Sequence, residues 1–378
     1  MQNRRRHLRL GVRVAAWLVV LCMVSFAFAG DVDVSGPDAI HSAGTAPRAF
    51  RNAEKKIQSC IVTIESFGGV SVGGGGPNRT QGISKPGEGP TTGVIISAEG
   101  HIITSTFNFL RQPPIITVVL NDGQRCVAKM LGRDDTRKVC MLKIDVEESL
   151  PTPELVDRTK LKVGQWAISL GVGYGNRQAA LSAGIISALN RMGGRAVQTD
   201  ANISPANYGG PLVDLRGRLI GICVPLHPSD KDETSGAQWY DSGIGFAVPL
   251  SDAQSWLDLL KTGKSVEPAF LGVAVKPHGE KQGVVVAKVQ ENSPAAKAGL
   301  KEGDLVLKLN DRSIIDVMDF TAQVKRRVSG EEIELTIIRD EEQQELALTL
   351  AAPPKPKDTA PAIPPLPGFD LPGKPKLP

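Results

Sequence analysis

Three segments of the chain hold the glycine-bounded turns and polar side chains from which a hydrolytic site could be built. They are TTGVIISAEGHIITSTFNFL at 91–110, GRDDTRKVCMLKID at 132–145 and QTDANISPANYGGPLVDLRGRLIGI at 198–222. Nucleophilic hydrolysis needs a nucleophile, a base within hydrogen-bond reach and a group that orients the base. The chemistry of this chain therefore depends on which residue types stand at the turns of these segments.

Together with GIGFAVPL at 243–250, the three segments resemble the HtrA family of trypsin-like serine proteases, in family order and at family spacing. In that family a histidine follows the G-x-I-x-T strand by three positions, an aspartate precedes the L-A-V-L-K strand, and a serine stands in G-N-S-G-G-P-L. The resemblance implies a mainly β fold, a trypsin-like double β-barrel. It also implies that GIGF either receives polypeptide by strand addition or merely closes the barrel.

The positions that match the family triad hold Phe107, Lys138 and Tyr208. Phenylalanine can take no proton, lysine is cationic where an anion should orient the base, and a phenol with a pKa near about 10 stays mostly protonated at neutral pH. A Lys138 and Tyr208 dyad is one alternative, because an ammonium stabilises a phenolate. We expect instead a packed cluster of the three side chains with cation–π character.

The resemblance further implies an oxyanion hole at Ala206, Asn207 and Tyr208. Ala206 replaces the usual glycine, so a positive φ there would strain the hole or let it collapse. We expect the remaining amides to bind a peptide carbonyl weakly.

A second unit at 268–352 resembles a bacterial PDZ domain, an α+β fold, through AFLGV, the run S-P-A-A-K-A-G-L-K-E-G-D and the helix DVMDFTAQVKRR. PDZ domains hold a terminal carboxylate on loop amides and the peptide between a strand and a helix. The implied peptide-binding positions are Phe270, Leu271, Gly272, Val273, Phe320 and Val324. The two helix residues either line the apolar pocket or are plain core residues.

The remaining segments indicate export. A basic end, an apolar run and small residues at Ala27 and Ala29 predict a signal peptide at 1–29, with an uncleaved membrane anchor as the alternative. We expect a disordered segment at 30–47, the trypsin-like domain at 48–262 and a proline-rich tail at 353–378. Loss of the five signal arginines lowers the formal net charge from +4 to −1, which disfavours nucleic acid as a partner.

Composition agrees with a turn-rich β protein, since 40 glycines accompany an aromatic content of only 4%. Cys60, Cys126, Cys140 and Cys223 lie in apolar runs, which favours buried thiols, with one disulfide as the alternative. No C-x-x-C pair suggests metal or redox chemistry, and we expect no cofactor.

The sequence thus predicts an exported, periplasmic pseudoprotease that binds unfolded or C-terminal polypeptide segments as a chaperone, scaffold or regulator. The resemblance also suggests a homotrimer, or a mixed trimer with an active relative. Two alternatives stay open: an active endopeptidase with atypical residues, and a structural envelope protein that acts through its proline-rich tail.

Overall fold

The computed structural model describes residues 45–67, 91–110, 112–172, 178–227, 237, 242–279 and 282–354. These residues form two compact units, and the chain passes from the first to the second between Lys264 and Ser265. The predicted signal peptide, residues 30–44 of the predicted disordered segment and the proline-rich tail from residue 355 lie outside the described residues. Residues 45–47, which we expected to be disordered, instead begin a helix, so that segment was predicted three residues too long. Within the described part, no helix is long and apolar enough to cross a membrane.

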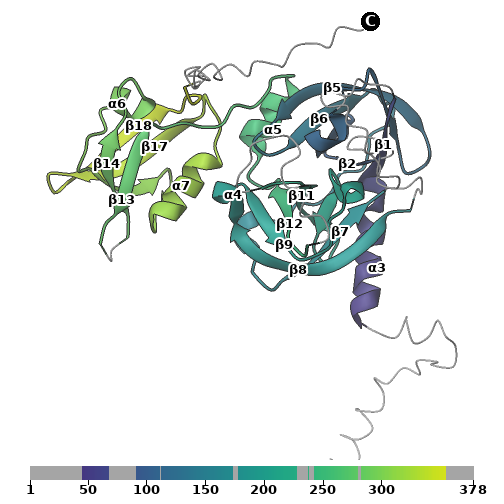
Figure 1. The fold of residues 1–378 in the computed structure, drawn as a ribbon. Helices are drawn as coiled ribbons and strands as arrows, with labels where there is room; N and C mark the ends of the chain where they lie inside the picture. The colour runs from purple at the N-terminus through teal and green to yellow at the C-terminus, as the bar shows by residue number, and fades with distance from the viewer. Residues whose placement is uncertain are drawn as a thin grey trace, which may run out of the picture. The chain divides into compact units, whose positions relative to one another are not determined.

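The first barrel closes in the order β1-β2-β3-β6-β5-β4 (Figure 1). Its strands are β1 (Ile61–Phe67), β2 (Thr91–Ile95), β3 (His101–Ser105), β4 (Ile115–Val119), β5 (Arg125–Asp134) and β6 (Val139–Ile144). Side chains alternate between the barrel interior and the surface along β5, as expected for a strand with one solvated face. The apolar interior of this barrel centres on fully buried residues such as Ile102, Leu142 and Ile144.

The second barrel closes in the order β10-β11-β12-β9-β8-β7. Its strands are β7 (Trp166–Gly171), β8 (Ala180–Asn190), β9 (Ala196–Thr199), β10 (Pro211–Val213), β11 (Leu219–Val224) and β12 (Gly245–Pro249). Two six-stranded barrels confirm the predicted trypsin-like fold class. Short helical turns join the strands: η1 (Gln58–Cys60), η2 (Thr106–Phe109), η3 (Arg158–Lys160), η4 (Pro205–Asn207) and the single-turn α4 (Arg191–Gly194).

Two longer helices pack on the first unit. α3 (Thr45–Ile57) lies outside the barrels beside β1 and β7 (Figure 1). α5 (Gln254–Lys261) buries Trp256. The guanidinium of Arg137 lies 5.3 Å from the centre of the Trp256 ring and bonds Asp134 at 2.6 Å, so this buried charge is paired on two sides.

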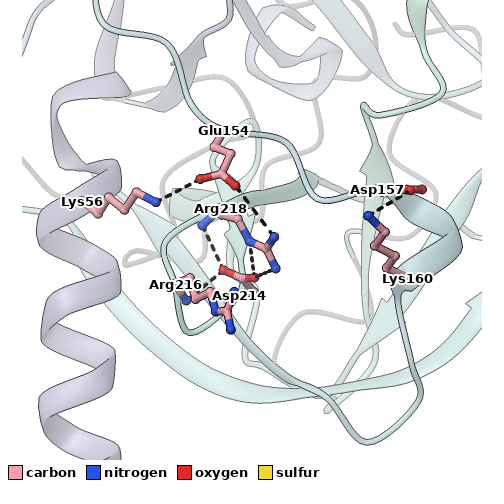
Figure 2. Close-up of polar contacts among 7 residues, drawn as sticks. All are labelled: Lys56, Glu154, Asp157, Lys160, Asp214, Arg216 and Arg218. Carbon is pink, nitrogen blue, oxygen red and sulfur yellow. Dashed lines mark hydrogen bonds and ion pairs between the residues drawn. The ribbon is translucent and has the colours of Figure 1, made fainter.

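A chain of ion pairs fastens α3 to the β10–β11 hairpin (Figure 2). Lys56 Nζ lies 3.2 Å from Glu154, whose other carboxylate oxygen is 3.8 Å from Arg218. Arg218 in turn bonds Asp214 at 2.7 Å. This bond to Asp214 raises the pKa of Arg218, so the guanidinium stays charged and the hairpin keeps its shape.

The second unit is a six-stranded sheet with two helices. Its main path runs β13-β14-β15-β17-β18, and β16 pairs with β15. The strands are β13 (Val273–Pro277), β14 (Val284–Val289), β15 (Leu305–Leu309), β16 (Arg312–Ser313), β17 (Glu332–Arg339) and β18 (Glu342–Thr349), and the helices are α6 (Pro294–Lys297) and α7 (Val317–Lys325). The path places β13 at one edge of the sheet, which leaves one side of this strand without a neighbouring strand among the described residues.

The four described cysteines are free and buried, as predicted, and none of them forms a disulfide within the described chain. Burial raises the pKa of the Cys140 and Cys223 thiols far above the usual value, because a thiolate in the barrel interior would lose its hydration.

Candidate functional site

The structure brings the three degenerate positions together where the two barrels meet. Phe107 lies in η2, directly after β3, and Lys138 directly precedes β6. The backbone carbonyl of Lys138 accepts from the Thr106 amide at 2.9 Å and from the Ser105 hydroxyl at 3.2 Å. Tyr208 follows η4 in the second barrel. Residues from both barrels therefore converge as they would in a trypsin-like site.

The rings of Phe107 and Tyr208 pack edge to face, with centroids 5.1 Å apart and planes at 75°. Both side chains are buried, at 4% and 3% exposure, and both belong to the apolar core of the second barrel. Lys138 is also buried, at 6% exposure, and has a positive φ of 57°. The two aromatic members of the expected cluster thus pack in a geometry that is favourable for aromatic pairs.

The buried Tyr208 side chain lines a small cavity of the second barrel. Around it, the remaining cavity measures about 10 Å³, which is no more than one water molecule needs. Its walls are Ile203, Val224, Pro225, Leu226, Ile244, Gly245 and Phe246, together with Tyr208 itself. The segment that contains Ile244, Gly245 and Phe246 is the one that the family resemblance places beside the specificity pocket, so the cavity left there is small.

The backbone amides of the expected oxyanion hole differ from the sequence-based expectation. The Asn207 amide donates to the Ser204 carbonyl at 2.8 Å, and the Tyr208 amide donates to the Pro205 carbonyl at 3.3 Å. Both donors are used inside the η4 turn rather than being left for a peptide carbonyl. Ala206 is not among the described residues with positive φ, so the turn has closed without the strain that alanine would otherwise carry.

Two side chains that the sequence analysis did not identify hold this turn in place. The Thr92 hydroxyl donates to the Ala206 carbonyl at 2.7 Å and accepts from the Val172 amide at 2.8 Å. Asn108 Nδ2 donates to the Tyr208 carbonyl at 3.0 Å. The η4 turn itself could have been predicted from Ser204 followed by Pro205, because serine before proline often starts a helical turn.

The strand that contains GIGF closes the barrel. β12 pairs with β11 through Phe246–Pro249 and with β9 through Gly245–Ala247. Phe246 and Ala247, paired on both sides, therefore offer no free edge to a peptide, whereas strand addition at Gly243 and Ile244, which precede β12, stays a prediction.

His101 does not replace the missing base. Its Nδ1 lies 2.7 Å from the Ser97 hydroxyl at the β2–β3 turn. Partial burial lowers its pKa, and the positive charges of Lys143 and Lys261 lower it further. Because β3 separates it from Phe107 by about 15–20 Å of extended chain, this imidazole lies away from the degenerate positions.

In the second unit, the predicted carboxylate loop precedes the edge strand β13. Phe270 anchors the loop, since its amide donates to the Ala351 carbonyl at 2.8 Å and its carbonyl accepts from the Ala351 amide at 3.1 Å. The amides of Leu271 and Gly272 donate to no group in the described part of the chain. Gly272 has φ +82°, and a Cβ there would collide with Ser293, so glycine is required by local geometry as well.

The predicted helix residues Phe320 and Val324 are 3% and 9% exposed and belong to the apolar core of the second unit. Val273, the first residue of β13, packs against the same core while staying partly exposed. Phe320 and Val324 are thus core residues of the second unit, and their role in holding a peptide stays a prediction.

Comparison with known families supports the predicted fold of both units. The trypsin-like peptidase domain family matches residues 91–222, and the PDZ domain family matches residues 269–350. Among curated relatives, a probable periplasmic serine endoprotease, DegP-like, from Halomonas elongata is 33% identical over 309 residues, covering 76% of this chain and 63% of the relative. The relative of the same description from Rickettsia prowazekii is 31% identical, covering 69% of this chain and 53% of the relative.

The chain thus spans 53% to 63% of the length of these relatives. Their periplasmic description supports an exported, periplasmic location for this chain. Among solved structures, the HtrA-type protease AlgW with a tripeptide is similar at a TM-score of 0.58 and 28% identity, covering 81% of this chain and 98% of that one. The serine endoprotease from Yersinia pestis is similar at a TM-score of 0.51 and 25% identity, covering 81% and 98%.

Proposed function

The chain is an HtrA-type homologue of the DegP-like serine endoproteases, a trypsin-like peptidase domain followed by a PDZ domain, and we propose that it binds unfolded or C-terminal polypeptide segments without cleaving them. The residues at the triad positions support this proposal. Phe107 cannot accept a proton, and Lys138 carries the wrong charge to stabilise an imidazolium. Tyr208 supplies a phenol in place of the serine hydroxyl.

The observation that carries the proposal is the packing of the residue at the serine position. The Tyr208 side chain is buried beside a cavity of only about 10 Å³, and the Tyr208 amide donates to the Pro205 carbonyl. Catalysis of acyl transfer depends on amides that are free to stabilise the developing oxyanion. A site that lacks the nucleophile, the base and the free amide has lost each part of that mechanism.

Polypeptide binding is assigned to the PDZ unit. β13 is an edge strand, and an extended peptide can add to such an edge through main-chain hydrogen bonds. The amides of Leu271 and Gly272, which have no acceptor among the described residues, are placed to receive a terminal carboxylate. In the periplasm this activity would serve protein quality control as a chaperone, scaffold or regulator.

We also propose that this chain associates with other subunits through its first unit. Phe50 on α3 packs edge to face on Trp166, with centroids 5.5 Å apart, yet Trp166 is still 46% exposed, and nearby in the sequence Val163 is 61% exposed. Exposed aromatic and aliphatic side chains at one place favour contact with another subunit. Together with the family resemblance, this supports a homotrimer or a mixed trimer with an active relative.

The test uses fluorophore-labelled casein, with cleavage and anisotropy recorded in parallel on the purified chain. We expect a rise in anisotropy without release of labelled fragments. The matched control is Gly272→Val, which should lose binding because it obstructs the carboxylate loop. Cleavage that follows the protein through purification and disappears in Tyr208→Phe would contradict the proposal and establish an endopeptidase with a tyrosine nucleophile.

A further inference from the structure

A serine and a histidine are hydrogen-bonded in the turn between β2 and β3, apart from the degenerate triad positions. The Ser97 hydroxyl oxygen lies 2.7 Å from Nδ1 of His101, and it also accepts from the His101 backbone amide at 3.3 Å. Both residues are half-buried, so solvent reaches the pair. A nucleophile within hydrogen-bond reach of a base is the first requirement of covalent catalysis.

Backbone hydrogen bonds hold this turn in one conformation. The Gly100 amide donates to the Ser97 carbonyl at 3.2 Å, and the Gly100 carbonyl accepts from the Ile144 amide at 3.0 Å. Gly100 has φ +92°, and a Cβ there would collide with the Ile144 carbonyl, so the turn packs directly on β6. The Leu150 amide donates to the Ala98 carbonyl at 3.0 Å. The serine is therefore presented from a fixed backbone.

The imidazole of this pair is suited to act as a base at neutral pH. Partial burial lowers the pKa of His101, and the positive charges of Lys143 and Lys261 lower it further, so the ring is neutral and can accept a proton at Nδ1. The Glu99 carboxylate is a second acceptor, because a hydrogen bond from Ser97 lowers the pKa of Glu99. A carboxylate of lowered pKa is too weak a base to take the serine proton.

The surroundings of the pair favour negative charge. The amide of Ala98, the residue directly after the serine, has no acceptor in the described part of the chain, and the residue after a nucleophile is a common donor to an oxyanion. Lys143 pairs with His101 across β3 and β6, so the two side chains lie on the same face of the barrel. Lys143 and Lys261 thus place two positive charges near the turn, where they would stabilise an anionic leaving group.

We propose that Ser97 and His101 form a catalytic dyad that hydrolyses small activated esters, the class whose leaving group departs as a stable anion. Nδ1 of His101 takes the hydroxyl proton while Oγ of Ser97 bonds to the acyl carbon, and the bond from that carbon to the leaving oxygen breaks. Water, deprotonated by the same imidazole, then cleaves the acyl–serine bond and Oγ regains a proton. This inference goes beyond the proposed function and needs neither the degenerate positions nor the PDZ unit.

The experiment treats the full chain with para-nitrophenyl acetate. Release of nitrophenolate is followed by absorbance, and mass spectrometry after an acid quench locates the acetyl group. We expect acetylation of Ser97, absent from Ser97→Ala and slowed about 100-fold in His101→Gln, the lower end of what a positioned base contributes. His278→Gln is the matched control, because His278 is a histidine of the second unit and its loss should change neither readout. Thermal melts of each variant confirm folding.

The pH profile separates the dyad from unspecific acetylation. Acetylation of Ser97 should fall as pH drops through the lowered pKa of His101 and level off above it, whereas acetylation of lysine amines keeps rising with pH. Glu99→Gln should keep the reaction. Acetyl groups on lysines alone, or a reaction lost in Glu99→Gln and retained in His101→Gln, would overturn the dyad. The casein anisotropy of Ser97→Ala, unchanged in either case, keeps this test separate from that of the proposed function.

Discussion

Replacing Tyr208 by the serine of the family pattern should destabilise the protein rather than restore catalytic activity. The ring is 3% exposed, packs on Phe107 at 5.1 Å and leaves only about 10 Å³ of its pocket empty. Truncating a buried aromatic side chain costs about 3–5 kcal/mol. For a unit of roughly 200 residues this corresponds to a fall in Tm of about 6–20 °C, since each kcal/mol shifts Tm by about 2–4 °C.

Urea denaturation followed by tryptophan fluorescence is the suitable assay. Trp166, Trp239 and Trp256, the tryptophans outside the predicted signal peptide, all precede residue 265, so the signal reports on the first unit and not on the PDZ unit. Tyr208→Phe is the matched control, because it keeps the ring and should cost less than about 1.5 kcal/mol. If Tyr208→Ser unfolded within about 0.5 kcal/mol of the unmodified chain, the ring would not be part of the core and the reasoning on the filled pocket would fail.

Three further outcomes follow from the same contacts. Gly272→Ala places a Cβ at positive φ, which costs about 1–2 kcal/mol, so isothermal titration with a carboxylate-ended peptide should show weaker binding than to the parent chain. Cys140 and Cys223, whose burial raises their pKa, should react with a thiol reagent only after unfolding, as mass spectrometry of labelled peptides would show. Although burial of Asp304 opposes it, hydrogen bonding to Arg339 lowers the pKa of Asp304. The stability that this pair adds is therefore present above about pH 4 and is lost as pH falls through the lowered pKa; Arg339→Met should remove that acid dependence in thermal melts of the chain.

Much of the architecture could be predicted from the sequence because the patterns that specify it are local. The resemblance of the segments at 91–110, 132–145 and 198–222 to the HtrA family implied a double barrel, and the run from Ser293 to Asp304 implied the PDZ unit. The three degenerate positions could be assigned because flanking glycine and threonine residues fix their register. In the structure, Phe107 lies in η2, Lys138 directly precedes β6 and Tyr208 directly follows η4.

The orientation of Tyr208 and the closure of the η4 turn could not be predicted, because both depend on contacts between distant segments. Whether Tyr208 points outward or into its pocket is decided by walls from β11 and β12 and by the Phe107 ring. The closure of the η4 turn depends on Thr92, which lies more than one hundred residues away in the chain and binds the Ala206 carbonyl. No pattern of spacing along the sequence records either contact.

The two units differ in the one property that strand addition requires. In the trypsin-like unit, Phe246 and Ala247 of β12 are paired on both sides, and Tyr208 lines a small cavity together with Phe246. In the PDZ unit, β13 keeps an open edge, and the amides before it keep their hydrogen-bonding capacity. A polypeptide gains main-chain hydrogen bonds only at an unpaired edge, so binding at the first unit would require its core to rearrange. The proposal that polypeptide binds at the PDZ unit therefore follows from the pairing of the strands, independently of the residues that replaced the triad.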